Sequence, residues 1–244
     1  MNRVLIFGAT SAIAQETARS LAGEGARFFL VARNERTLAD VAADLEVRGA
    51  AEVTVRVADL AELGALDELC DAAQAALGGI DMALIAQGVL PDQQACEASA
   101  AETLDALRVN TAGPAALMIR IGNILSLQGS GTLVVVSSVA GDRGRPSNYI
   151  YGASKALLSV MGEGMALALA GKGVKVLVVK PGFVDTPMTA AFPKGALWAS
   201  AQSVGKDIAA AVKKGRRGVI YVPFWWRFVM LVVRFAPGFL VRRL

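Results

Sequence analysis

The chain has 244 residues, of which 54% are apolar and 19% charged, and its formal net charge is +4. This length suits one large α/β domain, and the apolar content excludes a disordered chain. Lys and Arg are spread along the sequence, which argues against nucleic acid as a partner. Because the chain has no histidine, it has no imidazole base, and we expect no metal site.

Seven short apolar segments predict β-strands, and several are apolar throughout, as strands buried on both faces are. They are residues 3–7, 27–32, 52–57, 81–86, 132–137, 174–180 and 218–222. Segments with helical spacing, such as residues 35–48, separate them. The alternation predicts an α/β fold: a Rossmann-type, doubly wound parallel sheet of about seven strands with helices on both faces. Residues 1–222 are expected to form one domain.

Two features indicate the compartment. Cys70 and Cys96 form neither a disulfide framework nor a metal-binding pattern, so we expect buried, reduced thiols. The first predicted strand begins at about residue 3, which leaves no room for a signal peptide. We therefore expect a cytoplasmic protein.

The segment GATSAIA, residues 8–14, follows the first predicted strand and opens a helix at about residue 11 or 12. A helix N-terminus offers free N–H groups and the positive end of the helix dipole to a pyrophosphate. Gly8 permits the tight turn, and the small Ala12 lets a ligand approach. Thr10 and Ser11 can cap the helix or bond a phosphate. A structural turn without a ligand explains the segment equally well.

Arg33 follows the second predicted strand, at the place where a carboxylate would receive the ribose hydroxyls of NAD. A cation there suits the 2′-phosphate of NADP, so NADP is the predicted cofactor, with NAD as the alternative. Arg33 could also be a solvated loop residue. Asp59 and Leu60 follow the third predicted strand, where Asp59 could meet the adenine edge.

The segment YGASK, residues 151–155, places a phenol and an ammonium four residues apart, on one face of a helix. Lys155 is expected to lower the pKa of Tyr151, which is ordinarily about 10. Tyr151 could then give a proton to a carbonyl oxygen or take one from an alcohol. Ser138, just past the fifth predicted strand, could hold the substrate oxygen where charge develops.

Together these features resemble the short-chain dehydrogenase/reductase family over almost the whole chain. The matching segments are the Gly turn, ADL, RVNTAGP with Asn110, SSVAG with Ser138, YGASK and PGFVDT. The resemblance implies that Tyr151 is the catalytic acid/base and that Ser138 polarises the carbonyl. It further implies that Lys155 tunes Tyr151 and bonds the nicotinamide ribose, and that Asn110 holds a proton-relay water at a helix kink.

The resemblance also implies a cofactor site in which Thr186 and Val184 bond the nicotinamide carboxamide. The complete predicted set is Gly8, Thr10, Ser11, Ala12, Ile13, Arg33, Asp59, Leu60, Ala86, Gly88, Tyr151, Lys155, Pro181, Gly182, Val184 and Thr186. Two segments depart from the family pattern. Ala12 and Ala14 stand where glycines are usual, and IAQG, residues 85–88, keeps only Gly88 of an Asn-Asn-Ala-Gly motif.

Residues 223–244 form an apolar, basic tail that is too interrupted by charge to span a membrane. Its aromatic residues beside Arg227 and Arg234 suit a helix that lies in the bilayer interface and is broken at Pro237. The alternative is a tail packed on the domain or on a partner subunit. The basic run at 213–217 is expected to be a solvated turn.

The tail also resembles, more loosely, that of reductases of the decaprenylphosphoryl-2-keto-pentose type, which implies a lipid-linked keto-sugar substrate. Residues 187–205 would form a substrate lid, with Met188, Phe192 and Trp198 as apolar contacts. The leading hypothesis is an NADPH-dependent reductase that interconverts a carbonyl and a secondary alcohol. The alternatives are a non-catalytic NAD(P)-binding scaffold or redox-sensing partner, and a sugar-nucleotide epimerase. By analogy with relatives, a homo-oligomer, either a dimer or a tetramer, is expected.

Overall fold

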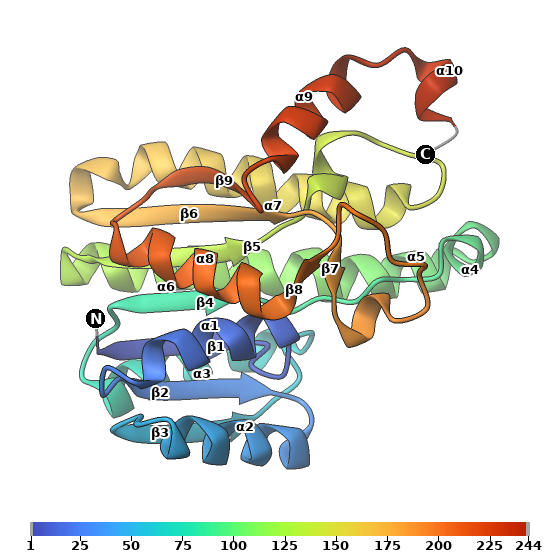
Figure 1. Ribbon diagram of the computed structural model, residues 1–244. Coiled ribbons are helices and arrows are strands. Elements are labelled where there is room, and N and C mark those ends of the chain that lie inside the picture. The colour runs from blue at the N-terminus through green and yellow to red at the C-terminus, as the bar shows by residue number, and fades with distance from the viewer. Residues whose placement is uncertain (1, 243–244) are drawn as a thin grey trace.

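The computed structural model describes residues 2–242, and its centre is a seven-stranded parallel sheet between two helical layers (Figure 1). The strand order is β3-β2-β1-β4-β5-β6-β9. The strands are β1 (Arg3–Phe7), β2 (Arg27–Ala32), β3 (Glu52–Val57), β4 (Met82–Ile85), β5 (Gly131–Val136), β6 (Val174–Pro181) and β9 (Gly218–Val222). All seven predicted strands are confirmed, with ends shifted by at most one residue.

The two helical layers give the sheet one apolar core on each face. α1, α2 and α8 cover one face, while α3, α6 and α7 cover the other (Figure 1). Their bounds are α1 (Ala12–Ala22), α2 (Glu35–Val47), α3 (Leu66–Leu77), α6 (Gly113–Gln128), α7 (Tyr149–Ala168) and α8 (Ala201–Lys213). The predicted helix at 35–48 is α2, which buries Leu38, Val41 and Leu45 at helical spacing.

Short helices and turns connect these elements. They are α4 (Gln93–Ala98), α5 (Ala100–Leu107), the 3₁₀ turns η1 (Leu63–Ala65), η3 (Val139–Asp142), η4 (Ala170–Lys172) and η5 (Pro187–Thr189), and the π-helical turn η2 (Arg108–Ala112). Cys70 and Cys96 are free and buried, as expected, and burial raises the pKa of Cys70 to about 12.

The connections define where a ligand can bind. From β1 the chain winds outward through β2 to β3, then returns to β4 on the other side of β1. The connections that follow β1 and β4 run in opposite directions along the sheet, and open α/β sheets bind ligands at such a switch point, outside the carboxyl ends of the strands.

The segment expected to form the lid is only partly irregular. β8 (Ala199–Ser200) pairs with β7 (Val184–Asp185), and residues 201–205 begin α8 instead of continuing the lid. α8 packs closely on α1, since a Cβ atom on Gly205 would lie 2.6 Å from the carbonyl carbon of Glu16. This packing buries Val204 and Gly205, whereas residues 202–203 stay exposed.

The tail forms α9 (Trp226–Phe235) and α10 (Gly238–Val241), with the break at Pro237 that the sequence predicts. It rises from the β9 edge of the sheet (Figure 1). Trp226 and Met230 are buried against Val139, so one face of α9 packs on the domain. The exposed apolar side chains of the tail are Phe224, Trp225, Phe228, Leu231, Val232, Phe235, Phe239 and Leu240. Within residues 2–242, no helix is long and apolar enough to cross a membrane; tail residues 243–244 lie outside the described part.

Candidate active site

A cleft of about 350 Å³ lies at the carboxyl ends of the strands, around the switch point between β1 and β4. Every residue predicted to bind the cofactor lines this cleft, and so does Ser138. Asn110 does not line it directly. A Cβ atom on Gly88 would lie 3.1 Å from the Asn110 Oδ1 atom, which places Asn110 immediately behind the wall.

The first turn requires a glycine at position 8. Gly8 has φ +78°, and a Cβ atom there would lie 2.6 Å from the backbone nitrogen of Gln87. α1 begins at Ala12, directly at the cleft, and Ser11 is its N-cap residue without making a side-chain cap bond. Ala14 is completely buried beneath the turn, so an alanine fits where the family usually has a glycine.

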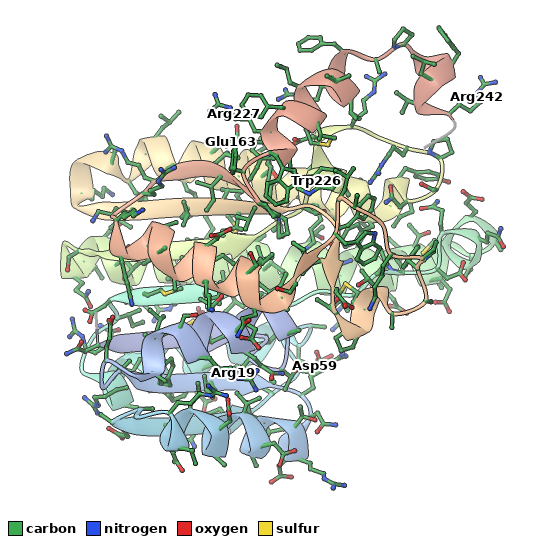
Figure 2. All side chains as sticks on the ribbon, viewed as in Figure 1. Arg19, Asp59, Glu163, Trp226, Arg227 and Arg242 are labelled. Atoms are coloured by element: carbon green, nitrogen blue, oxygen red, sulfur yellow. The ribbon has the colours of Figure 1, made fainter. Side chains whose placement is uncertain are left out.

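Arg33 and Asp59 lie at the mouth of the cleft. Their side chains approach to 3.8 Å between Arg33 Nη1 and Asp59 Oδ2, and the Arg33 side chain is 62% exposed. Asp59 also accepts a hydrogen bond from the backbone nitrogen of Ala61 at 2.9 Å. Figure 2 shows Asp59 at the edge of the molecule where the strands end. This weak pairing leaves the guanidinium accessible to an anionic ligand.

Tyr151, Lys155 and Ser138 meet deeper in the cleft. Tyr151 and Lys155 lie one turn apart on α7, and the Lys155 Nζ atom lies 5.6 Å from the centre of the Tyr151 ring. Lys155 also donates a hydrogen bond to the carbonyl oxygen of Val136 at 3.1 Å. Ser138 follows β5, and its hydroxyl lies close enough to the Tyr151 phenol to lower the pKa of that phenol. The helix α7 and the end of β5 thus bring these three side chains together in the cleft.

The electrostatics differ from the sequence expectation. Burial raises the pKa of Tyr151 to about 12, and the neighbouring Ser138 hydroxyl only partly opposes this rise. Burial likewise lowers the pKa of Lys155 to about 8. The expected lowering of the Tyr151 pKa is therefore not found, because desolvation disfavours both charged forms. In this state Tyr151 holds its proton at neutral pH and can act as a proton donor.

Asn110 lies in the π-helical turn η2, the irregular helical position expected for it. Its Oδ1 atom accepts a hydrogen bond from the Val89 backbone nitrogen at 2.8 Å, and its Nδ2 atom donates to the Val89 carbonyl oxygen at 2.9 Å. The buried amide therefore holds the segment after β4 in place behind the cleft.

Sequence reasoning missed two polar residues of the cleft wall, Ser137 and Gln87. The Ser137 hydroxyl donates to the Lys155 carbonyl oxygen at 2.8 Å and contacts the Ser159 hydroxyl at 2.8 Å, so it anchors α7 to the end of β5. The adjacent serines at 137 and 138 were the available signal. Gln87 lines the cleft, and its buried Oε1 atom has no hydrogen-bond partner among residues 2–242. The departure of IAQG from the family motif marked this position.

These residues fit a dinucleotide. The α1 N-terminus and Arg33 suit phosphates, Gly8 and Gly88 admit close approach, and the unpartnered Gln87 amide oxygen can accept a ligand hydrogen. With Tyr151, Lys155 and Ser138, the cleft defines a Rossmann-type oxidoreductase site.

The chain also matches a known protein family. The model of the short chain dehydrogenase family matches residues 2–196. The chain therefore belongs to the short-chain dehydrogenase family and is an NAD(P)-dependent oxidoreductase. The narrower resemblance to reductases of decaprenylphosphoryl-linked keto-sugars stays a prediction.

Relatives and solved structures agree with this assignment. An uncharacterized oxidoreductase of Mycobacterium tuberculosis is 38% identical over 241 residues, covering 99% of this chain and 96% of the relative. Another, from Streptomyces coelicolor, is 38% identical over 251 residues, covering 99% and 95%. An actinorhodin polyketide ketoreductase variant, solved with NADPH, has a TM-score of 0.81 at 23% identity and covers 92% of this chain and 97% of its own. A short-chain type dehydrogenase/reductase from Mycobacterium ulcerans has a TM-score of 0.77 at 20% identity, covering 90% and 87%. Both structures confirm the fold.

Proposed function

We propose that the protein is an NADPH-dependent reductase that converts a carbonyl to a secondary alcohol, with Tyr151 as the proton donor. One observation carries the proposal: a phenol that holds its proton lies beside the Ser138 hydroxyl and the Lys155 ammonium in a cleft that fits a dinucleotide.

The residues divide the chemistry among them. When bound, the dinucleotide supplies the hydride. The Ser138 hydroxyl hydrogen bonds to the substrate carbonyl oxygen and polarises it. Tyr151 transfers its proton to the same oxygen and becomes a phenolate, which the nearby Lys155 ammonium stabilises. In the reverse direction the phenolate accepts the alcohol proton. Asn110 would hold the proton-relay water that the family resemblance implies.

The preference for NADPH rests on Arg33. Its accessible guanidinium at the cleft mouth suits a 2′-phosphate, since guanidinium and phosphate form strong, charge-assisted hydrogen bonds. That the ketoreductase of the same fold was solved with NADPH supports this preference.

The Tyr151→Phe substitution tests the proposal. NADPH consumption is measured against a panel of aliphatic, aromatic and quinone carbonyls, and NADPH binding is measured by fluorescence. We expect turnover to fall by about 10²–10⁴-fold, the usual contribution of a general acid, while the Kd for NADPH changes little. Unchanged turnover would contradict the assignment. NADPH binding by the wild-type protein without consumption of any carbonyl would favour the scaffold alternative.

An apolar, and specifically a lipid-linked, carbonyl substrate is the second part of the proposal. Phe183 stacks on Trp198 of the expected lid with ring centres 5.5 Å apart, and meets the edge of Trp226 at 5.3 Å. Met188, also in the lid segment, lines the cleft. Met188 thus adds an apolar side chain to the cleft wall, and the aromatic cluster packs directly behind Gly182, which also lines the cleft.

We further propose that the tail contacts an anionic membrane surface. The outer face of α9 exposes Phe228 and Phe235, and every charged residue after Asp207 is a Lys or an Arg. Figure 2 shows Trp226 turned toward the domain while Arg242 points away from it. An amphipathic helix with cationic residues and exposed aromatics binds such interfaces.

Vesicle co-sedimentation tests this surface. We expect the wild-type protein to sediment with phosphatidylglycerol-rich vesicles, and a Phe228→Glu/Phe235→Glu variant to stay in the supernatant. Val47→Glu is the matched control, because Val47 is also an exposed apolar residue but lies at the end of α2. A subunit contact would be favoured instead if the wild-type protein does not sediment and the double substitution lowers the molecular mass in solution.

We propose a homo-oligomer that forms through the outer faces of α6 and α7. These faces expose Leu127, Val160 and Leu167, which are 89%, 71% and 82% accessible. Covering them with the same faces of a second copy would bury this apolar surface. Light scattering should show an oligomer that Val160→Glu converts to a monomer.

A further inference from the structure

A buried polar cluster lies outside the cleft and was not anticipated from the sequence. The Lys180 Nζ atom lies 2.7 Å from Asp142 Oδ1, and the two side chains are only 6% and 2% exposed. The Tyr221 hydroxyl donates to Asp142 Oδ2 at 2.6 Å. Glu163, half exposed on α7, lies 3.6 Å from Lys180. Burial and the Asp142 carboxylate together raise the pKa of Tyr221, so its phenol remains the donor.

Asp142 joins three elements whose ends meet at the active site. It is the last residue of η3, Lys180 is in β6, and Tyr221 is in β9. A buried ion pair contributes little net stability because desolvation offsets its attraction, whereas losing one partner is costly. The pair is therefore better explained by the geometry that it imposes than by the stability that it adds.

The turn held by Asp142 is the one that carries Ser138. Ser138 is the N-cap residue of η3, and its hydroxyl oxygen accepts a hydrogen bond from the Ala140 backbone nitrogen at 3.1 Å. Its carbonyl oxygen accepts from Gly141 at 3.1 Å. With both ends of this four-residue turn fixed, movement of Asp142 would move the Ser138 hydroxyl.

The other two partners hold the opposite wall of the cleft. Lys180 directly precedes Pro181 and Gly182, which line the cleft. Tyr221 directly precedes Val222, whose carbonyl oxygen accepts a hydrogen bond from the Gly182 backbone nitrogen at 3.1 Å. One carboxylate thus sets the separation between the Ser138 turn and the strand end beneath the nicotinamide position.

We propose that Asp142 is a positioning residue for Ser138: its bonds to Lys180 and Tyr221 hold the Ser138 turn at the distance from Tyr151 that proton transfer requires. This inference rests on the proposed role of Ser138. Asp142 itself does not line the cleft and touches no reacting atom.

The mildest test removes one hydroxyl. Tyr221→Phe deletes the bond to Asp142 but keeps the ring, and Asp142→Asn/Lys180→Met removes both charges without leaving one buried alone. Asp81→Asn is the matched control. Asp81 binds Arg3 at 2.6 Å before β4, at the opposite end of the sheet from the cleft.

A double-substitution cycle measures coupling to Ser138. We expect Tyr221→Phe to lower kcat about 5- to 10-fold with the Kd for NADPH unchanged, and to lower it less than about 2-fold in a Ser138→Ala background, since coupled sites are non-additive. Asp81→Asn should leave kcat unchanged in both backgrounds. Equal losses in the two backgrounds would overturn the proposal.

Hydrogen exchange gives a readout that needs no substrate. We expect the amides of residues 139–142 to exchange about 5-fold faster or more in Tyr221→Phe and in Asp142→Asn/Lys180→Met, and at the wild-type rate in Asp81→Asn. Unchanged exchange at these amides would overturn the positioning role whatever the activity. If exchange behaves as expected but the wild-type protein reduces no carbonyl, the proposed function fails, whereas the conclusion that Asp142 holds the Ser138 turn remains.

Discussion

The Lys155 ammonium lies 5.6 Å from the centre of the Tyr151 ring and is bound to the Val136 carbonyl oxygen, and no carboxylate within residues 2–242 forms an ion pair with it. It is a buried cation, 4% exposed, whose compensation comes from neutral groups. Burying such a charge lowers the free energy of unfolding. The charge on Lys155 should therefore affect both the stability of the protein and its affinity for the cofactor.

Lys155→Met should stabilise the protein at neutral pH. Burial lowers the Lys155 pKa from 10.5 to about 8, so below pH 8 the folded state bears the whole cost of the charged form. Between pH 8 and 10.5 the unfolded chain binds more protons, so stability rises with pH there. We expect the free energy of unfolding to rise by about 2 kcal/mol at pH 7, a value from which the lost hydrogen bond to Val136 is already subtracted. This gain should disappear above about pH 10. Urea unfolding at several pH values measures it, and a less stable variant at pH 7 would contradict the argument.

The affinity for NADPH should fall as the pH rises through about 8. Lys155 is expected to bond the nicotinamide ribose as an ammonium, and above this pKa it loses its charge. Loss of one charge-assisted hydrogen bond predicts a Kd about 10-fold larger at pH 9.5 than at pH 7. Fluorescence titration checks this, and Lys155→Met should give a flat profile. An equally steep profile in the variant would assign the effect to another group.

The strands, and the placement of Tyr151 and Lys155 on one helical face, were predictable because local patterns encode them. β5 and β6 contain the unbroken apolar runs 133–136 and 176–179, and Tyr151 and Lys155 share a helical face by spacing alone. The raised Tyr151 pKa was not predictable, because it depends on how deeply tertiary packing buries the phenol. Asp142 binds Lys180 and Tyr221 from 38 and 79 residues away, a separation at which no periodicity connects them.

The cofactor preference should depend on Arg33. Arg33→Ala should raise the Kd for NADPH about 10- to 100-fold, the cost of losing a charge-assisted contact to the 2′-phosphate, and leave the Kd for NADH nearly unchanged. Arg48→Ala is the control, since Arg48 is an exposed arginine that pairs with Asp44 at the far end of α2. Separate titrations with the two dinucleotides decide it. Equal affinities for NADPH and NADH, unchanged by Arg33→Ala, would contradict the preference for NADPH.

Because Trp226 of α9 packs directly on Gly182, we expect position 182 to tolerate no side chain. A Cβ atom on Gly182 would lie 1.8 Å from the Trp226 Nε1 atom, and Trp226 is buried and held by Val139 and Phe183. We expect Gly182→Ala to destabilise the protein by about 1–3 kcal/mol, because the indole must move in a packed site.

A second substitution separates this clash from a backbone effect. Trp226→Leu removes the clashing indole, so the cost of Gly182→Ala should shrink to within about 0.5 kcal/mol in that background. Gly164→Ala is the control: its Cβ atom would meet nothing within 4 Å on α7, and it should gain about 0.5–1 kcal/mol from helix propensity. Urea unfolding of the four proteins of the cycle and the control measures these differences. A Gly182→Ala protein as stable as the wild type would show that α9 moves freely from the wall of the cleft.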